Sequence, residues 1–366
     1  MASFFKNFLN SDKTTTRSLL HEQIPITGTL LSGNYGAFGS ETNIKNYAHG
    51  MFQSVYDYAY LSSSANHILD LTVGYHSTSS LSASTQNSTQ RKNKINIYNQ
   101  MAQVLMGHDL NGNIERFDSD GVIADTANKM NEVFFVNFAR LLTKDEIKKG
   151  SFQLELGVAP TASGPGADAG FAKRIKLTDV SGTNGYFVNG AIGQYGTLYC
   201  QNTAGTPLGG NDTHAKGGLV FYQAGIAVVT ASVFQGLLSK SCFLPDRSGY
   251  AHTGSNALLT GSSISGACDA IRNRIYNLQY NNTTELNSTI YFCRMNNSEF
   301  NYSSNPTYVS ASRIVVKNDP LDVPLSYATT VGLYSADNEL LAVAKVSEPL
   351  RKDPSNELTL RVRLDY

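Results

Sequence analysis

The C-terminal end of the chain constrains its fold more than any other stretch, because it consists of consecutive strand-like segments. Its last segment, ELTLRVRLDY, alternates apolar with polar residues. Alternation of this kind places one set of side chains on one face of a strand, here Leu358, Leu360, Val362 and Leu364. Upstream, residues 329–334 and 340–346 are further apolar runs, and 336–339 between them predicts a tight hairpin turn. The pattern predicts an antiparallel module over residues 286–366.

The opposite face of this last strand is polar. It carries Arg361 and Arg363, with no acidic residue between them. Two guanidinium groups are costly to bury unless a carboxylate or solvent reaches them. We therefore expect this face to be exposed, or to contact another protein through ion pairs.

Elsewhere the apolar spacing predicts a mixture of helices and strands. The segments with helical spacing are 44–60, 95–106 and 263–279. Strand-like patterns occupy 68–76, much of the chain from residue 133 onward, and a buried hairpin around 223–225. We expect the α+β class: a β-rich fold of antiparallel, sandwich-like sheets with two to three helices, mainly in the N-terminal third.

The same patterns suggest a domain organisation. The predicted parts are an N-terminal arm (1–40), a helical region (41–128) and a β-rich domain (129–366), with a loop-rich insertion (159–216) and the C-terminal antiparallel module (286–366). The arm begins with an apolar cluster at Phe4, Phe5 and Phe8 and is then polar. Such segments often wrap onto a neighbouring subunit, which predicts order only in the assembly. A short helix packed on the chain's own core is an equally good interpretation.

Composition favours a subunit of an assembly. The 366 residues include 29 basic and 29 acidic ones, and only 16% are charged, against roughly 25% in ordinary soluble domains. A net charge near zero favours association, and the 20 tyrosines supply a residue type that interfaces use often. A β-rich protein of any function would also use much Tyr and Thr, which is the plainer interpretation.

Cysteine usage and hydropathy bear on where the chain is kept. No secretory signal and no apolar run of about 20 residues is found, so we expect no membrane partner. The chain is then made and kept in a cytoplasm until something releases it. In that setting we expect reduced thiols at the four isolated cysteines, Cys200, Cys242, Cys268 and Cys293.

Several phrases of the sequence carry a resemblance to a known class of protein. They are EFNYSSNPTYV (299–309), TTVGLYSADNELLAVAKVSEPL (329–350), the closing LTLRVRLDY, FFVNFARLLTKDEIKKGSFQLELG (134–157) and GGLVFYQAGIAVVTASVF (217–234). They resemble virion structural proteins of tailed bacteriophages, most closely those of large contractile-tailed phages. The resemblance covers roughly 129–158 and 217–366.

This resemblance implies a part of the particle, located in the virion and assembled in the host cytoplasm. Its implied partners are other virion proteins and copies of itself, in a multicopy assembly, and it brings no enzymatic residues. We expect a position in the tail baseplate or the neck, because no long spine helix of the kind used by shell proteins is visible. The alternatives are a receptor- or glycan-binding tail protein and, less favoured, an enzyme that degrades cell wall or capsule.

Candidate chemical motifs each have a plainer interpretation. In HDLNGNIERFDSDG (108–121), Asp109, Asn111 and Asn113 match a calcium loop, but Ile114 replaces the required Gly and Asp120 the bidentate Glu. Two turns, at 111–112 and 118–121, explain this segment better. The glycines of 163–170 lack dinucleotide-loop spacing. We therefore expect no catalytic, cofactor-binding or metal-binding residues, and no enzyme activity.

The remaining candidate site is an interface for other proteins. Exposed aromatic and arginine side chains are typical of such surfaces. The basic clusters at 91–94 and 173–176 are short and balanced by acids elsewhere, so nucleic acid is not an expected partner. The candidate interface residues are Phe4, Phe5, Phe8, Tyr302, Tyr308, Arg361 and Arg363.

Overall fold

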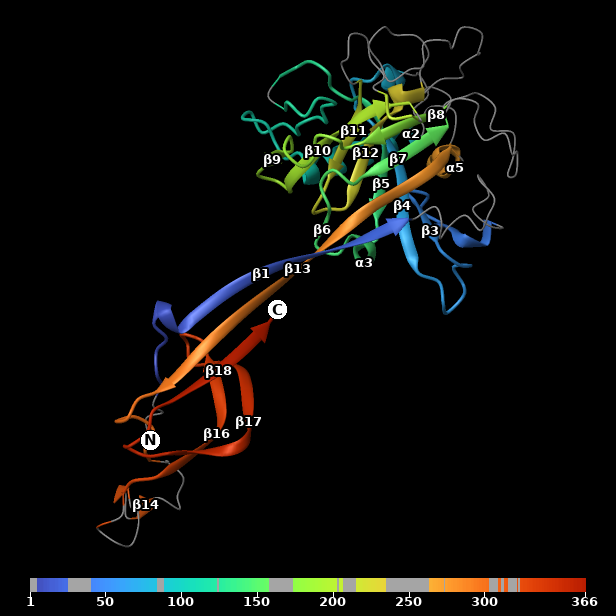
Figure 1. Cartoon of the computed structure of the whole chain (residues 1–366). Helices are drawn as coiled ribbons and strands as arrows, with labels where there is room; N and C mark the ends of the chain where they lie inside the picture. Colours follow the sequence, from blue (N-terminus) through green and yellow to red (C-terminus); the bar gives the residue numbers. More distant parts are fainter. Residues whose placement is uncertain are drawn as a thin grey trace. The chain divides into compact units, whose positions relative to one another are not determined.

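The computed structural model of the chain is rich in antiparallel strands and contains three α-helices in its described part (Figure 1). It describes residues 5–25, 41–83, 89–123, 125–157, 174–202, 204–206, 215–234, 263–272, 274–302, 309–310, 313–314, 321 and 323–366. The α-helices are α2 (Thr89–Leu105), α3 (Arg140–Thr143) and α5 (Ile264–Arg272). Short 3-10 helices are η1 (Asn10–Asp12), η2 (Glu41–Asn43), η3 (Ser80–Ala83) and η4 (Ala231–Phe234).

The strands run through nearly the whole described chain. They are β1 (Lys13–Pro25), β2 (Ile44–Asn46), β3 (Gln53–Tyr56), β4 (His67–Tyr75), β5 (Glu132–Phe138), β6 (Glu146–Ile147), β7 (Gln153–Gly157), β8 (Arg174–Thr178), β9 (Phe187–Asn189), β10 (Gly193–Gln201), β11 (Lys216–Phe221), β12 (Ile226–Thr230), β13 (Ile275–Met295), β14 (Val309–Ser310), β15 (Arg313–Ile314), β16 (Ser326–Tyr334), β17 (Leu340–Lys352) and β18 (Leu358–Asp365).

The chain divides into two compact units. Unit 1 consists of Met1–Leu19 and Glu285–Tyr366, and unit 2 consists of Leu20–Thr284. Strands β1 and β13 contribute residues to both units, because the unit boundaries lie within them. The first and last parts of the chain therefore belong to the same unit.

Unit 2 is built on one antiparallel sheet. Its strand order is β7-β8-β10-β11-β12-β5-β4-β3-β2, and the first part of β13 pairs with β7. Strands β11 and β12 form the predicted hairpin, with Leu219 opposite Val228. Gly225, at φ +68°, lies in the turn of this hairpin. The predicted strands over 68–76 and 133–139 are confirmed as β4 and β5.

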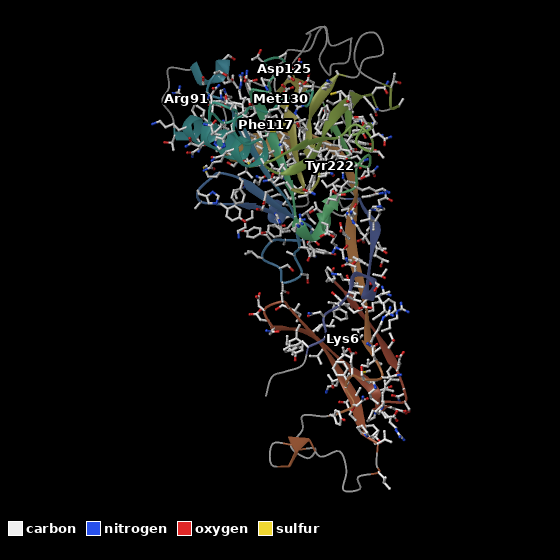
Figure 2. All side chains as sticks on the ribbon, turned by 90° about the vertical axis from the view of Figure 1, so that its left-hand side faces the viewer. Lys6, Arg91, Phe117, Asp125, Met130 and Tyr222 are labelled. Carbon is white, nitrogen blue, oxygen red and sulfur yellow. The ribbon has the colours of Figure 1, made fainter. Side chains whose placement is uncertain are left out.

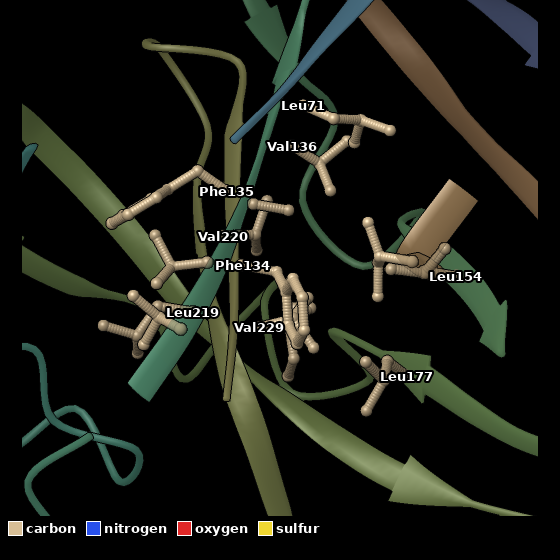
Figure 3. Packing of buried hydrophobic residues seen from close by; sticks show 14 of the residues in the cluster. Leu71, Phe134, Phe135, Val136, Leu154, Leu177, Leu219, Val220 and Val229 are labelled. Carbon is tan, nitrogen blue, oxygen red and sulfur yellow. The ribbon is translucent and has the colours of Figure 1, made fainter. Parts of the chain in front are cut away.

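Both faces of the central strands are covered. In β5, Phe134, Phe135 and Val136 are all buried, although successive side chains point to opposite faces of the sheet. Figure 3 shows Phe134 beside Val229, its register partner on β12. A strand covered on both faces has a continuous hydrophobic sequence, which the VFFV run of β5 provides.

Helix α2 covers one side of this sheet by packing closely on β4. A Cβ at Gly74 of β4 would lie only 2.9 Å from backbone atoms of α2, so a glycine permits this approach. From α2, Tyr98 meets Phe117 edge-on at 5.4 Å between ring centroids, and Phe117 meets Phe135 at 5.6 Å. The Tyr98 hydroxyl donates a hydrogen bond to the carbonyl of Met130 (2.7 Å), near Phe117 in Figure 2. Aromatic side chains thus join helix, loop and sheet.

Unit 1 contains the predicted C-terminal strands. Strand β18 pairs antiparallel with the second part of β13, from Ser288 opposite Asp365 to Met295 opposite Leu358. Strands β16 and β17 form the predicted hairpin as a separate two-stranded sheet, and β14 with β15 forms another. The segment predicted as a polar arm contains strand β1, which pairs with β13, so regular structure is present there that the sequence pattern did not reveal.

The predicted helix over 44–60 is wrong, because this segment forms β2 and β3. Ile44 and Val55, which match helical spacing, are cross-strand partners on the buried face of a hairpin. The chain reverses near Gly50, which has φ +62°. A reversal can bring apolar residues to one face as a helix does, and the spacing alone does not separate the two. Residues 41–128 accordingly hold three strands as well as α2.

The other two predicted helices are present with different bounds. Helix α2 begins at Thr89, earlier than predicted, and Gly107 beyond its end has φ +84°, as expected of a helix C-cap. Helix α5 ends at Arg272, and Ile275 already begins β13, so the second half of the predicted helix 263–279 is a strand. The β-rich α+β class is confirmed, whereas helices mainly in the N-terminal third are not. The sandwich-like packing of sheets stays a prediction.

The expectation of reduced thiols at all four cysteines is wrong. Cys268 and Cys293 are free, but Cys200, buried on β10, is disulfide-bonded. Cys242 lies outside the described residues. Burial raises the pKa of the Cys268 thiol to about 12, which keeps this side chain protonated and unreactive.

Candidate protein–protein interface

The described part of unit 1 has almost no fully buried apolar side chain. Among its described residues, Leu333 is the only hydrophobic side chain that is buried, at 7% exposure. The other buried hydrophobic side chains of the described chain belong to unit 2. A unit without a core gains little to offset the conformational entropy lost on folding. Its partly covered faces are therefore candidate contacts for a partner.

Strand β18 shows the predicted two faces. Leu358, Leu360, Val362 and Leu364 are half-buried, and the alternate residues Thr359, Arg361, Arg363 and Asp365 are exposed. The alternation is confirmed, but the apolar side is only half covered. The polar side is open, as expected from its two arginines.

The two arginines of β18 differ in their contacts. Arg363 Nε donates to the carboxylate of Asp365 (2.8 Å) and to the hydroxyl of Ser288 (2.8 Å). The hydrogen bond from Ser288 and the Arg363 guanidinium hold the pKa of Asp365 below its usual range. Arg361 forms no ion pair with any described residue. Arg361 is therefore the arginine available to a partner.

The β16–β17 hairpin exposes an apolar face that the sequence reasoning missed as an interface. Tyr334 pairs with Leu340, and Gly332 pairs with Val343, which puts these residues on one side. Leu341 is the extra residue of a β-bulge beside them and is 67% exposed. We call the exposed side chains of this side the hairpin face: Tyr334, Leu340, Leu341 and Val343.

Gly332 leaves room for side chains of the hairpin face to lie over the backbone. A Cβ at Gly332 would lie 2.9 Å from the Tyr334 ring and 3.3 Å from Leu340. The signal for this face was present in the sequence, since 340–344 is apolar at five successive positions. Such a run predicts apolar side chains on both faces of a strand, not on one.

Two of the predicted aromatic residues near the N-terminus are brought to these strands. Phe5 meets Tyr334 of the hairpin face edge-on at 4.8 Å between ring centroids. Phe8 meets Tyr291 of β13 at 5.3 Å. Between them, Lys6 (labelled in Figure 2) forms an ion pair with Glu299, and this hydrogen bond lowers the pKa of the Glu299 carboxyl. Phe5 and Phe8 both remain partly exposed.

Three predicted interface residues remain, namely Phe4, Tyr302 and Tyr308. Tyr302 is about half exposed, at 49%. Phe4 and Tyr308 lie outside the described residues. The structure thus brings Phe5 to the hairpin face, Phe8 to β13 and both arginines to the open side of β18.

A buried lysine fixes the base of the hairpin. Lys352, the last residue of β17, is fully buried, and its ammonium group donates to Asn301 Oδ1 (2.7 Å) and to the carbonyls of Asp353 (2.9 Å) and Asn297 (3.3 Å). All three ammonium protons therefore have an acceptor. This arrangement ties residues 297–301 to the end of the hairpin.

A metal site needs several ligating side chains placed together. The described residues contain no group of three or more His, Cys, Asp or Glu side chains placed to hold a metal ion. In the loop that partly matches a calcium site, one Asp109 oxygen accepts the backbone N–H groups of Asn111 and Asn113 (2.8 Å each). Both predicted turns are confirmed, with Gly112 and Gly121 each at φ +82°. The glycine segment 163–170 lies outside the described residues.

Comparison with protein-family models, with curated proteins and with solved structures finds no match to this chain. Within the described residues, no helix is both long and apolar enough to span a membrane.

Proposed function

We propose that this chain is a structural subunit of a tailed-phage virion, in the tail baseplate or the neck, that acts through protein–protein interfaces. In this proposal it binds other virion proteins and copies of itself, and it carries out no catalysis. Sandwich-like stacking of its sheets belongs to the same proposal. The resemblance of residues 299–309 and 329–350 to virion structural proteins supports the placement in a particle.

The observation that carries the proposal is the absence of a core in the described part of unit 1. Its strands are regular and amphipathic, yet their apolar sides are half-buried or open. Edge strands with open apolar sides are an aggregation hazard in a free monomer. In an assembled particle the same surfaces are covered by neighbours, and obligate interfaces of this kind exceed roughly 2,000 Å².

The direct test is to look for the chain in particles. Particles purified from cells that carry the gene are analysed by mass spectrometry, beside particles from cells in which the gene is disrupted. We expect the chain in a fixed ratio to other tail proteins, and defective tails without it. Infectious particles of normal morphology that lack the chain would refute the proposal.

A second candidate function, receptor or glycan binding, is favoured by an aromatic surface on unit 2. Tyr58 and Tyr60 are exposed, and Tyr60 lies 6.4 Å from Tyr56 between ring centroids. Exposed rings of this kind can stack on the apolar faces of sugars. A Tyr58→Ala, Tyr60→Ala variant that binds host surface polysaccharide as the wild type does, or a wild type that does not bind it, would exclude this candidate.

A further inference from the structure

We propose that unit 1 binds unit 1 of a second copy of this chain, with the hairpin face and its acidic turn of one copy against the arginine side of β18 on the next. This inference rests on the proposed function, because it names a partner of that interface. Its residues are all in unit 1, so each copy carries both halves of the contact.

The first argument is the mismatch between the pattern of β17 and its burial. Residues 340–344 are apolar without interruption, which is typical of a strand covered on both faces. One side is partly covered: Ala342 pairs with the buried Leu333, and Ala344 is half-buried. The hairpin face on the other side is open, with Val343 at 53% exposure. No second layer covers this face among the described residues.

The size of the open surface is that of an interface. With about 150–250 Å² for an aromatic side chain and somewhat less for Leu or Val, the hairpin face and Phe5 together expose on the order of 500 Å². The largest apolar patch on a typical monomer is roughly 300–600 Å². A standard interface buries about 800 Å² per partner. The hairpin face and Phe5 therefore supply more than half of one side of a stable contact.

Charge identifies the second copy as the occupant. Residues 1–19 and 285–366 contain eleven basic and eleven acidic residues, so copies of unit 1 do not repel each other. The charges are nevertheless separated along the unit. The hairpin turn carries the exposed acids Asp337 and Glu339, and the open side of β18 carries Arg361. None of the three forms an ion pair with a described residue.

These two surfaces are complementary in charge. The aliphatic stems of Arg361 and Arg363 can cover the apolar side chains of a neighbour's hairpin face, while the guanidinium groups reach that neighbour's acidic turn. The turn and β18 are different surfaces, so the contact is heterologous. A heterologous contact repeats from copy to copy and closes into a ring or continues as a filament.

The test is charge reversal followed by mixing. One variant carries Asp337→Lys and Glu339→Lys, and the other carries Arg361→Glu. Each variant alone places like charges across the contact, so light scattering after gel filtration should report monomers, with association weakened about tenfold or more. An equimolar mixture of the two variants restores opposite charges at every contact. We expect this mixture, and the wild type, to form oligomers that weaken as salt is raised.

A second pair of variants tests the apolar part. Leu341→Ser removes apolar contact without adding a charge and should weaken the oligomer, whereas Leu141→Ser should preserve it, because Leu141 is equally exposed at 65% but lies on α3 of unit 2. Circular dichroism confirms that every variant is folded. A monomeric wild type, single charge variants that assemble normally, or a mixture that stays monomeric each overturns the inference. A monomeric wild type that is found in purified particles overturns only the inference, whereas oligomers that are missing from particles overturn the proposed function.

Discussion

Asp179 provides a pH dependence of stability whose sign follows from its surroundings. The carboxylate follows β8 and is fully buried. Its two oxygens accept the backbone N–H groups of Phe152 (2.8 Å) and Gly150 (2.7 Å), which joins the start of β7 to the end of β8. The hydroxyl of Tyr222, labelled in Figure 2, is close enough to this site that a Cβ at Gly182 would contact both side chains. Burial nevertheless dominates and raises the pKa of Asp179 to about 6.

The magnitude follows from the difference between folded and unfolded states. The pKa of an aspartate in an unfolded chain is about 3.9, so the difference is about two units, or roughly 3 kcal/mol at 1.36 kcal/mol per unit. The folded state holds the proton more tightly. The stabilisation from protonated Asp179 is therefore complete below about pH 4 and is lost as pH rises through about 6.

Asp179→Asn removes this titration, and chemical denaturation measures the result. The difference in unfolding free energy between variant and wild type should shift by about 2 kcal/mol in the variant's favour from pH 4 to pH 7, because part of the titration lies below pH 4. Burial also raises the pKa of a second carboxyl, Asp118, to about 6. Both proteins contain Asp118, so the effect of its titration cancels in the difference. Asp125→Asn, at an exposed carboxyl in unit 2, is the control. A difference that stays flat over this pH range, or shifts the other way, refutes the reasoning.

Three further predictions concern packing and pairing. Lys352→Met leaves two buried acceptors, on Asn301 and Asp353, without a donor and should lower the unfolding free energy by about 3–5 kcal/mol. Lys13→Met, at an exposed site, should change it by less than about 0.5, as measured by denaturation. Gly74→Ala forces a Cβ against the backbone of α2 and should cost about 1–3 kcal/mol, while Gly190→Ala, with open space around its Cβ, should cost far less; equal melting temperatures would contradict this. Deleting 357–366 removes β18, the antiparallel partner of β13 in unit 1, and should yield an aggregating chain; a truncated protein that melts cooperatively would disprove the importance of this strand.

Local patterns predicted the strands well where one face differs from the other. The alternation at β18 and the turn before β17 were enough to predict this strand and this hairpin, because strand period and turn chemistry are encoded in neighbouring residues. The pairing of Ile44 with Val55 was not accessible, since a hairpin and a helix can both bring these positions to one face. The end of α5 was missed for a related reason: Ile275 and Leu278 continue the apolar spacing but are buried in a strand.

The sequence predicted candidate interface residues from their residue types, and the exposure of side chains in the structure changed which residues belong to the interface. Arg361 could be selected from the sequence, because two arginines on one side of a strand need solvent or a partner. Arg363 is already paired, with Asp365 two residues further along the same side of β18 and with Ser288, which only the β13–β18 register brings there. The hairpin face was overlooked because an apolar run is ordinarily taken as core, and only the structure reveals that one of its sides is open.

Unit 1 is built from segments that precede and follow unit 2 in the sequence, and this determines the order in which the units fold during synthesis. A ribosome makes residues 1–19 before unit 2, but their partners in unit 1 begin at Glu285, so these residues must wait until all of unit 2 has emerged. Unit 2 is continuous in sequence and can collapse on its own core during that interval. Pairings over such sequence separations form slowly, because a long loop must close before any contact is gained. Strand β18 is made after β13, and its pairing closes an edge of β13 that is otherwise available to other nascent chains.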